Sequence, residues 1–282
     1  TDNSTNGNNL NTTSGTAPTY VLSNTSFNNK PTVRFNNNGA IYCSNPTGLP
    51  VGSQAMTTYV VGVWNGTGGN HSMFSWGANA YVGNRWGVFT DGSSGIQFES
   101  QGVGSTFRSF IADIPFIFSL PYAAGTSYSS VTTYLNGVGV TGGSSFTPNV
   151  INPVQEIAIG RPATAGVEYW AGDVAEVIVY NTTHDAATRQ KVEQYLDQKY
   201  GIYNQYVVSS NFTTSNLILH LDASNLTSYP GSGTTWYDLS GNGNDVVAVG
   251  APTYTATYNG GFTFSSVSDY FDTTPNLQES YV

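Results

Sequence analysis

Residues 172–201, GDVAEVIVYNTTHDAATRQKVEQYLDQKYG, run from an apolar strand directly into a helix. Residues 174–179 are mostly apolar and β-branched, which predicts a strand covered on both faces, or on one face with a small-residue partner on the other. From Asp185 the apolar residues follow a helical period, and one face carries Ala186, Val192, Tyr195, Leu196 and Tyr200. Thr183 or Asp185 can cap the start of this helix, and Gly201 lies where it would end.

Short strands separated by turn residues are predicted for most of the remaining chain. Residues 1–16 are polar and rich in Gly and Asn, which predicts a loop. Asn136-Gly137 separates two predicted strands and is typical of a two-residue hairpin turn, because both residues tolerate positive φ. Many short strands at close spacing predict an all-β sandwich or barrel, with the helix packed on an edge or between loops. The predicted strands are 18–22, 32–35, 40–43, 57–64, 72–76, 85–90, 96–99, 116–120, 131–135, 138–141, 157–160 and the strand within 172–201.

The composition of the 282-residue chain excludes several classes of protein. Lys and Arg number 8 against 17 Asp and Glu, giving a net charge of −9, which argues against binding a nucleic-acid backbone. The single cysteine, Cys43, excludes an internal disulfide and a cysteine-based metal cluster, and we expect it to be a small buried residue. No apolar run approaches the roughly 20 residues of a membrane helix, so no membrane insertion is expected.

Two parts of the chain resemble each other at a separation of about 236 residues. Residues 237–245, YDLSGNGND, match residues 1–9, TDNSTNGNN, and Ala-Pro-Thr-Tyr occurs at both 251–254 and 17–20. Such a period is much longer than that of solenoid repeats. It predicts one domain at 1–203 that lacks its first strand, a linker at 204–216, and the N-terminal part of a second, truncated copy at 217–282.

Three segments resemble a known family: LILHLDASN and WYDLSGNGN at 217–225 and 236–244, IAIGR at 157–161, and GDVAEVIVYN with the helix ending in YLDQKYG. The chain resembles the concanavalin A-like lectin/glucanase superfamily, and within it the laminin-G-like domains of bacterial and viral surface proteins. The resemblance implies an all-β fold of two antiparallel sheets in a jelly-roll sandwich, with one short C-terminal helix per domain. It also implies binding of glycans or proteins at a surface. Eukaryotic relatives usually carry a disulfide near the end of the domain, which this chain lacks.

The carboxylates do not follow the pattern of a glucanase. Such enzymes need paired carboxylates on one strand, and the E-x-D-x-x-E arrangement is absent. Asp173 and Glu176 would lie on opposite faces of a strand, and Glu168 is not in register with Asp173. We therefore expect Glu176 to be structural, bonded to a turn or to Arg161. His71, His184 and His220 have no partners at metal-ligand spacing. The sequence predicts a protein without catalytic residues, and a degenerate or active glycoside hydrolase is the alternative.

Oxygen-bearing side chains recur in the two matching loops, as Asp2, Asn6 and Asn8 and as Asp238, Asn242 and Asn244. Alternating oxygen ligands on a Gly-rich loop are typical of calcium sites, which take six to eight oxygens. The alternative is an Asx-rich turn whose side chains bond its own backbone. One carboxylate per loop is few for calcium, and both possibilities remain open.

Aromatic residues supply the candidates for ligand contact. Trp64, Trp86 and Trp170 lie in strand patterns and are expected in the core, as aromatic residues dominate sandwich interiors. Trp76 precedes Gly-Ala-Asn, and Tyr81 follows shortly after, so both are predicted on a loop rim where they would stack on sugar rings.

The sequence thus predicts a non-enzymatic repeat module of a large extracellular, cell-surface or virion-surface protein. Its role would be carbohydrate binding and adhesion, or the structural unit of a fibre, filament or sheath. Its expected partners are glycans or neighbouring copies of itself, in a homo-oligomeric or tandem assembly.

Overall fold

The computed structural model describes residues 1–66, 69–91, 95–202, 215–223, 225, 227–255 and 261–273. The chain divides into two compact units, Thr1–Tyr206 and Val207–Val282, and each is described by itself. Residues 204–214 of the predicted linker lie outside the described residues. No helix in the described part of the chain is long and apolar enough to cross a membrane.

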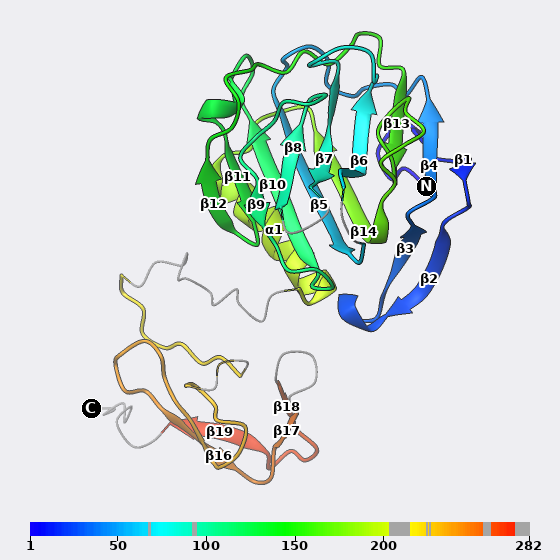
Figure 1. The fold of residues 1–282 in the computed structure, drawn as a ribbon. Helices are drawn as coiled ribbons and strands as arrows, with labels where there is room; N and C mark the ends of the chain where they lie inside the picture. The colour runs from blue at the N-terminus through cyan, green and yellow to red at the C-terminus, as the bar shows by residue number, and fades with distance from the viewer. Residues whose placement is uncertain are drawn as a thin grey trace. The chain divides into compact units, whose positions relative to one another are not determined.

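The first unit is a sandwich of two seven-stranded sheets whose neighbouring strands are all antiparallel (Figure 1). The predicted all-β jelly-roll sandwich is therefore confirmed. The front sheet has the order β1 (Thr12–Gly15), β4 (Gly39–Ser44), β13 (Glu156–Ile159), β6 (His71–Gly77), β7 (Arg85–Thr90), β8 (Gly95–Glu99) and β9 (Arg108–Ser109). The back sheet has the order β12 (Val138–Thr141), β11 (Thr132–Leu135), β10 (Phe116–Tyr122), β5 (Met56–Trp64), β14 (Ala171–Tyr180), β3 (Lys30–Asn36) and β2 (Thr19–Asn24).

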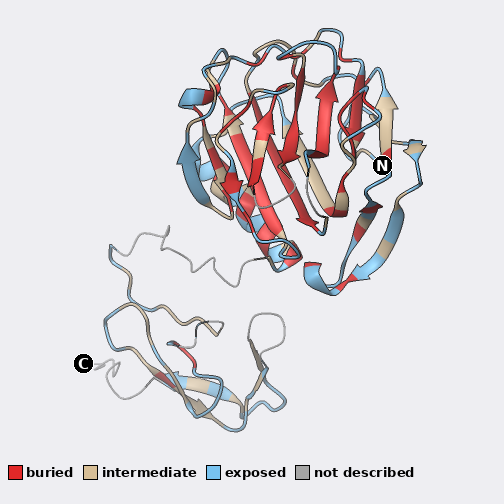
Figure 2. Cartoon of the chain, in the orientation of Figure 1, coloured by how far each residue is buried: buried red, intermediate tan, exposed pale blue. Residues whose placement is uncertain are grey.

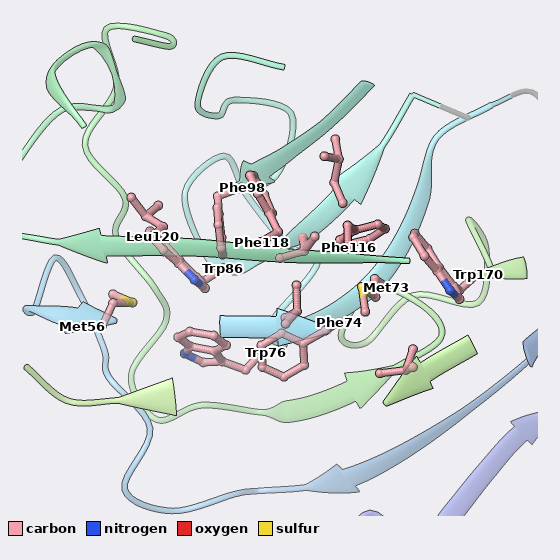
Figure 3. Close-up of a cluster of buried hydrophobic side chains, with 14 of the residues drawn as sticks. Met56, Met73, Phe74, Trp76, Trp86, Phe98, Phe116, Phe118, Leu120 and Trp170 are labelled. Carbon is pink, nitrogen blue, oxygen red and sulfur yellow. The ribbon is translucent and has the colours of Figure 1, made fainter. Parts of the chain in front are cut away.

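Aromatic side chains fill the space between the two sheets (Figure 3). Phe98 of the front sheet stacks on Phe118 of the back sheet with ring centroids 4.5 Å apart. Trp86 meets Tyr122 edge-on across the same gap at 5.3 Å. Such ring pairs add to the hydrophobic stabilisation that burial alone supplies. The short 3₁₀ turn η2 (Tyr128–Ser130) adds the Tyr128 ring to this core, whereas Phe27 of the 3₁₀ turn η1 (Thr25–Phe27) lies in a separate buried cluster.

The helix α1 (Ala186–Tyr200) has the predicted caps. The Asp185 carboxylate accepts a hydrogen bond from the Thr188 N–H at 2.7 Å, and Gly201 ends the helix with a φ of 62°. The predicted position at an edge or between loops is wrong, because the helix packs on the outer face of the back sheet. There Leu196 and Tyr200 join a second buried apolar cluster with residues of β5 and β10. This cover explains why β5 is buried along its whole length (Figure 2).

The buried face of α1 differs from the predicted apolar face. Tyr195 is 47% exposed, whereas the charged residues Arg189 and Glu193 are buried. They form an ion pair, Glu193 accepts a hydrogen bond from the Ser119 hydroxyl at 2.5 Å, and Arg189 lies 3.6 Å from the ring centroid of Tyr134. The sheet offers a hydroxyl and an aromatic face at this point, so it accommodates a charged pair that an apolar surface would exclude.

Two local predictions have different outcomes. The prediction that residues 1–16 form only a loop is wrong, since β1 pairs with β4 along its four residues. Its polar side chains are tolerated because β1 is an edge strand with mostly exposed residues. The hairpin prediction is confirmed, because Asn136 (φ 58°) and Gly137 (φ 71°) form the turn between β11 and β12.

The second unit is smaller, and its described strands are β15 (Thr235–Trp236), β16 (Val246–Val249), β17 (Thr253–Thr255), β18 (Gly261–Thr263) and β19 (Tyr270–Thr273). In the first unit β1 pairs with β4 while β2 pairs with β3. In the second unit β16 pairs with β19 while β17 pairs with β18. In both units, therefore, the first of four consecutive strands pairs with the fourth, and the second pairs with the third.

Candidate functional site

The predicted position of Trp76 is wrong. Trp76 lies within β6 and is fully buried, and its indole N–H donates to the Pro50 carbonyl at 3.0 Å. The strand continues to Gly77, and residues before β5 cover the ring, so no face of this indole is exposed to a ligand. Trp64, Trp86 and Trp170 are also fully buried, as predicted.

Tyr81 is on an exposed loop between β6 and β7, and its side chain is 76% exposed. Asn79 holds the start of this loop, because its N–H donates to the Thr164 hydroxyl and its side-chain oxygen accepts from Arg85, both at 2.7 Å. The Asn84 N–H closes the loop on the Tyr81 carbonyl at 3.0 Å. Tyr81 is thus presented by an ordered loop, and its contact with a ligand stays a prediction.

Charged side chains lie on the outer face of the front sheet near this loop. Arg85 is buried and forms an ion pair with Glu99 at 2.7 Å, and Glu99 also accepts from the Gly102 N–H. Burial raises the pKa of the nearby Glu168 carboxyl, while the positive charge of Arg85 acts in the opposite direction. The Glu99 carboxylate is bonded to Arg85 and to a backbone amide. Glu99 and Glu168 therefore do not form a pair of free carboxylates, and the cluster holds the neighbouring loops in place.

Glu176 does not bond to a turn or to Arg161, as the sequence predicts, but to the helix α1. Its carboxylate accepts from Lys199 and from the Tyr200 hydroxyl of α1, both at 2.9 Å, and not from Arg161. Arg161 instead forms a buried bidentate pair with Glu156. Glu176 is structural, as predicted, but it joins the helix to β14, which the chain order alone does not reveal.

A polar hollow lies where three strands of the back sheet come together. The asparagine hollow is lined by Arg34, Phe35, Asn36, Asn37, Asn65, Ala171 and Gly172, with a cavity volume of about 510 Å³. Its walls come from the end of β3, the residue after β5 and the start of β14. The register aligns these positions, because Gly172 pairs with Phe35 on one side and with Trp64 on the other.

A buried carboxylate fixes the guanidinium at this hollow. Arg34 donates through Nε and Nη2 to the two Asp173 oxygens at 2.7 and 2.8 Å, and Asn24 donates to the same carboxylate at 2.7 Å. The side chain of Asp173 is only 3% exposed, whereas that of Arg34 is 49% exposed. The hydrogen bonds to the Asp173 carboxylate raise the pKa of Arg34, so the guanidinium stays charged.

Two further residues that line the hollow, Gly172 and Asn65, are constrained as well. A Cβ at Gly172 would lie 2.0 Å from the Val63 carbonyl oxygen, and its φ is 144°, so only glycine fits here. Asn65 donates its side-chain amide to Asp113 at 2.5 Å, which orients the amide. Asn36, Asn37 and Asn65 are all exposed. The hollow therefore presents to solvent an oriented guanidinium and an oriented amide, beside the amides of Asn36 and Asn37.

The two loops predicted for calcium have the same internal hydrogen bonds. In each, the Asp carboxylate accepts from the N–H and hydroxyl of the serine two residues later and from the N–H six residues later. The Asp N–H donates to a side-chain oxygen seven residues later, and the serine hydroxyl accepts from the next Asn N–H. These five bonds measure 2.6–3.2 Å.

This pattern favours the Asx-turn alternative over a metal site. The carboxylates of Asp2 and Asp238 are engaged by their own loops, and Asn8 bonds the backbone of Thr47 through both side-chain atoms. Across the residues the structure describes, no group of three or more His, Cys, Asp or Glu is placed to hold a metal ion. The donor set fits calcium poorly, and calcium binding stays a prediction.

Sequence reasoning missed the asparagine hollow. Its one local signal is the run Asn36-Asn37-Asn38 at the end of a strand, where Asn37 has a φ of 61°. Asn65 and Gly172 lie in distant parts of the sequence, and only the pairing of β14 with both β3 and β5 brings them together.

No protein-family model and no curated protein matches the chain. Among solved structures, domain 4 of an extracellular family 43 arabinanase from Geobacillus stearothermophilus, in complex with arabinotriose, is similar at 16% identity and a TM-score of 0.48. That match covers 65% of this chain and 87% of the arabinanase domain.

Two further structures are similar over a small part of their own length. Trypanosoma rangeli sialidase in complex with sialic acid has 13% identity and a TM-score of 0.46, with 66% of this chain and 29% of the sialidase covered. Tailspike protein 2 of Escherichia coli O157:H7 bacteriophage CAB120 has 12% identity and a TM-score of 0.45, with 68% and 28% covered. At such identities and scores, what these proteins bind does not transfer to this chain.

Proposed function

We propose that the chain is a carbohydrate-recognition module without hydrolytic activity, and that the asparagine hollow binds the glycan. The observation that carries this proposal is the lining of the hollow, which combines three exposed asparagines with a guanidinium held by a buried carboxylate. Each sugar hydroxyl both donates and accepts hydrogen bonds, and an asparagine amide offers both functions in one plane.

The size and rigidity of the hollow support this assignment. A volume of about 510 Å³ lies within the roughly 300–1,000 Å³ of small-molecule pockets. Two of the five Arg34 N–H bonds are used by Asp173, so the guanidinium is oriented while its Nη1 side is left to the solvent. A group already held in place loses little conformational entropy when a ligand binds.

The lining also supports binding without hydrolysis. Glycoside hydrolysis requires two carboxylates on either side of the scissile bond. Within the described residues that line the hollow there is no Asp or Glu. The alternative, a glycoside hydrolase, would place its carboxylates elsewhere, and release of reducing sugar from β-glucans by the purified chain would favour it over the binding module.

We place this module among the laminin-G-like domains of the concanavalin A-like superfamily, in tandem copies within an extracellular, cell-surface or virion-surface protein. The recurring hydrogen bonds of the Asp2 and Asp238 loops support the tandem arrangement, as does the recurring pairing of four consecutive strands. A chain with only 9% charged residues and abundant Asn, Ser and Thr is in keeping with adhesion or with a fibre or sheath subunit.

A glycan array tests the assignment of the site. The purified chain is applied to a panel of plant, bacterial and animal glycans together with the double variant Asn36→Ala/Asn65→Ala. Asn38→Ala is the matched control, because Asn38 is an exposed neighbour that does not line the hollow. Loss of signal in the double variant alone supports the hollow. Loss in Tyr81→Ala with full binding by the double variant would move the site to the Tyr81 loop.

A further inference from the structure

Three charged side chains determine the charge of the asparagine hollow. Arg34 lines the hollow and forms its ion pair with the Asp173 carboxylate, so these two charges cancel. Asp113 adds a second carboxylate beside the hollow, because it accepts a hydrogen bond from the Asn65 side chain at 2.5 Å. Asp113 is exposed, and in the described part of the chain no Lys or Arg forms an ion pair with it. One positive and two negative charges leave the hollow and its bonded partners net negative.

Most of the other basic residues are neutralised by carboxylates of their own. All eight Lys and Arg residues of the chain lie in its described part. Apart from Arg34, four of them form ion pairs, namely Arg85 with Glu99, Arg161 with Glu156, Arg189 with Glu193 and Lys199 with Glu176. These four pairs add no net charge to the surface around the hollow.

The three remaining basic residues are not part of the hollow. Arg108 belongs to β9 at the edge of the front sheet, where it donates to two backbone carbonyls. Lys30 begins β3 four residues before Arg34, which is about 13 Å along the strand. Lys191 is exposed on α1 and does not line the hollow. Exposed charges more than about 10 Å apart are largely screened at ordinary ionic strength, so Lys30 does not compensate the charge of Asp113.

The lining of the hollow offers hydrogen-bond donors and acceptors together. A guanidinium has five N–H bonds, and Arg34 uses two of them for its carboxylate partner, which leaves the two on Nη1 and one on Nη2. Asn36 and Asn37 are exposed, and each amide has both a donor and an acceptor. Asn65 donates through its side-chain nitrogen, so its side-chain oxygen is left to accept. A ligand that satisfies these groups must both accept and donate hydrogen bonds.

Neutral and anionic sugars differ in this respect. A hydroxyl both donates and accepts, and two neighbouring hydroxyls of a sugar ring present both functions side by side. The oxygens of a carboxylate or a sulfate only accept. In the hollow, such a group would bond to Arg34 but would leave asparagine oxygens without a donor, and a desolvated acceptor without a partner is costly. The anion would also be repelled by Asp113.

We propose that the asparagine hollow selects neutral glycans and rejects sugars that carry a carboxylate or a sulfate. This selectivity rests on the proposed carbohydrate binding and adds the class of sugar that the hollow takes. Neighbouring hydroxyls of a neutral sugar bond to the free edge of Arg34 and to the asparagine amides. Asp113 determines the specificity by its charge, although it does not line the hollow itself.

Matched pairs of glycans test the selectivity. Each pair differs at every sugar unit: a glucan and its form with the primary hydroxyls oxidised to carboxylates, methyl-esterified and free oligogalacturonate, and a desulfated and a sulfated galactan. Within a pair that binds, the neutral member is expected to bind at least about fivefold more tightly, since one like-charge contact in water is worth about this factor. High salt screens charges and should reduce the difference in the unmodified chain.

Asp113→Asn tests the cause of the selectivity, because it removes the charge and keeps an oxygen for the Asn65 amide. The preference for the neutral member should fall to less than about half of its value in the unmodified chain. Asp185→Asn is the control, because it changes the net charge equally and asparagine also caps helices.

The outcomes separate the selectivity from carbohydrate binding itself. Equal or tighter binding of the acidic members, or a preference that Asp113→Asn leaves intact, would overturn the selectivity while the hollow still binds glycans. Binding of none of these pairs and of no glycan on the array would refute carbohydrate binding, and the selectivity with it.

Discussion

The Arg34 guanidinium and the Asp173 carboxylate form a bidentate ion pair, with N–O distances of 2.7 and 2.8 Å, that joins β3 to β14. The carboxylate is buried and the guanidinium is half-exposed, so one partner is fixed in the protein and the other is presented to solvent. This pair connects the architecture of the back sheet to the chemistry of the asparagine hollow.

Removal of the charge from Asp173 should weaken the fold and loosen the hollow. Asp173→Asn leaves the Arg34 guanidinium with one acceptor, and we expect a loss of about 1–3 kcal/mol in the free energy of unfolding, measured in urea. Arg34→Met leaves a buried carboxylate without its cation and should cost about 3–5 kcal/mol. The double variant should lose less than the sum of the single losses. Additive losses would show that the pair is not coupled.

Truncation of Trp76 should lower the stability of the protein far more than truncation of Tyr81. Trp76→Ala removes a fully buried ring from the core and should cost about 3–5 kcal/mol of stability. Tyr81→Ala removes an exposed ring and should change stability by no more than about 0.5 kcal/mol. Thermal and chemical unfolding of the two variants measure this difference. Similar stability losses for both would contradict the placement of Trp76 in the core.

The Asp238 loop should be sensitive to acid. Burial acts to raise the pKa of Asp238, but hydrogen bonds from Ser240, His220 and Asn244 lower it to about 2. The pKa is lower in the folded than in the unfolded protein, so the carboxylate stabilises the loop above pH 4. That contribution is lost as the pH falls from about 4 to about 2. Solvent screening keeps its size below about 1 kcal/mol.

The amide protons of Ser240 and Asn244 report this titration by NMR. Both should shift with a midpoint near pH 2 in the unmodified chain and remain unshifted in Asp238→Asn. A midpoint near the ordinary aspartate value would mean that the loop hydrogen bonds do not form in solution.

Addition of a calcium chelator separates the two interpretations of the Asp2 and Asp238 loops. Both carboxylates already accept hydrogen bonds from their own backbones, so we expect the melting temperature of the purified chain to be the same with and without chelator. Asp2→Asn should then lower stability equally in both conditions. A fall in melting temperature that added calcium reverses would favour the metal site.

Local sequence signals predict the fold well where a few neighbouring residues decide the conformation. Asp185 and Gly201 fix the ends of α1 through a side-chain cap and a left-handed residue, and Asn136-Gly137 fixes a hairpin. The apolar run of β5 is similarly clear, since both of its faces are buried.

The remaining features depend on pairing between distant residues. A helical period places charges on the exposed face, but Arg189 and Glu193 are buried because Ser119 and Tyr134 of the back sheet receive them. The asparagine hollow exists because β14 brings the end of β3 beside the end of β5. No short-range pattern specifies which strands become neighbours, and hence neither the hollow nor the burial of Trp76 follows from its own segment.

Titration calorimetry with the glycan that gives the strongest array signal is the strictest test of the claim that the asparagine hollow binds carbohydrate. The unmodified chain and Asn38→Ala should bind this glycan equally. Asn36→Ala/Asn65→Ala should weaken binding by at least about tenfold, since it removes two hydrogen-bonding amides without touching the core. Equal affinity of the double variant and the unmodified chain would contradict the claim.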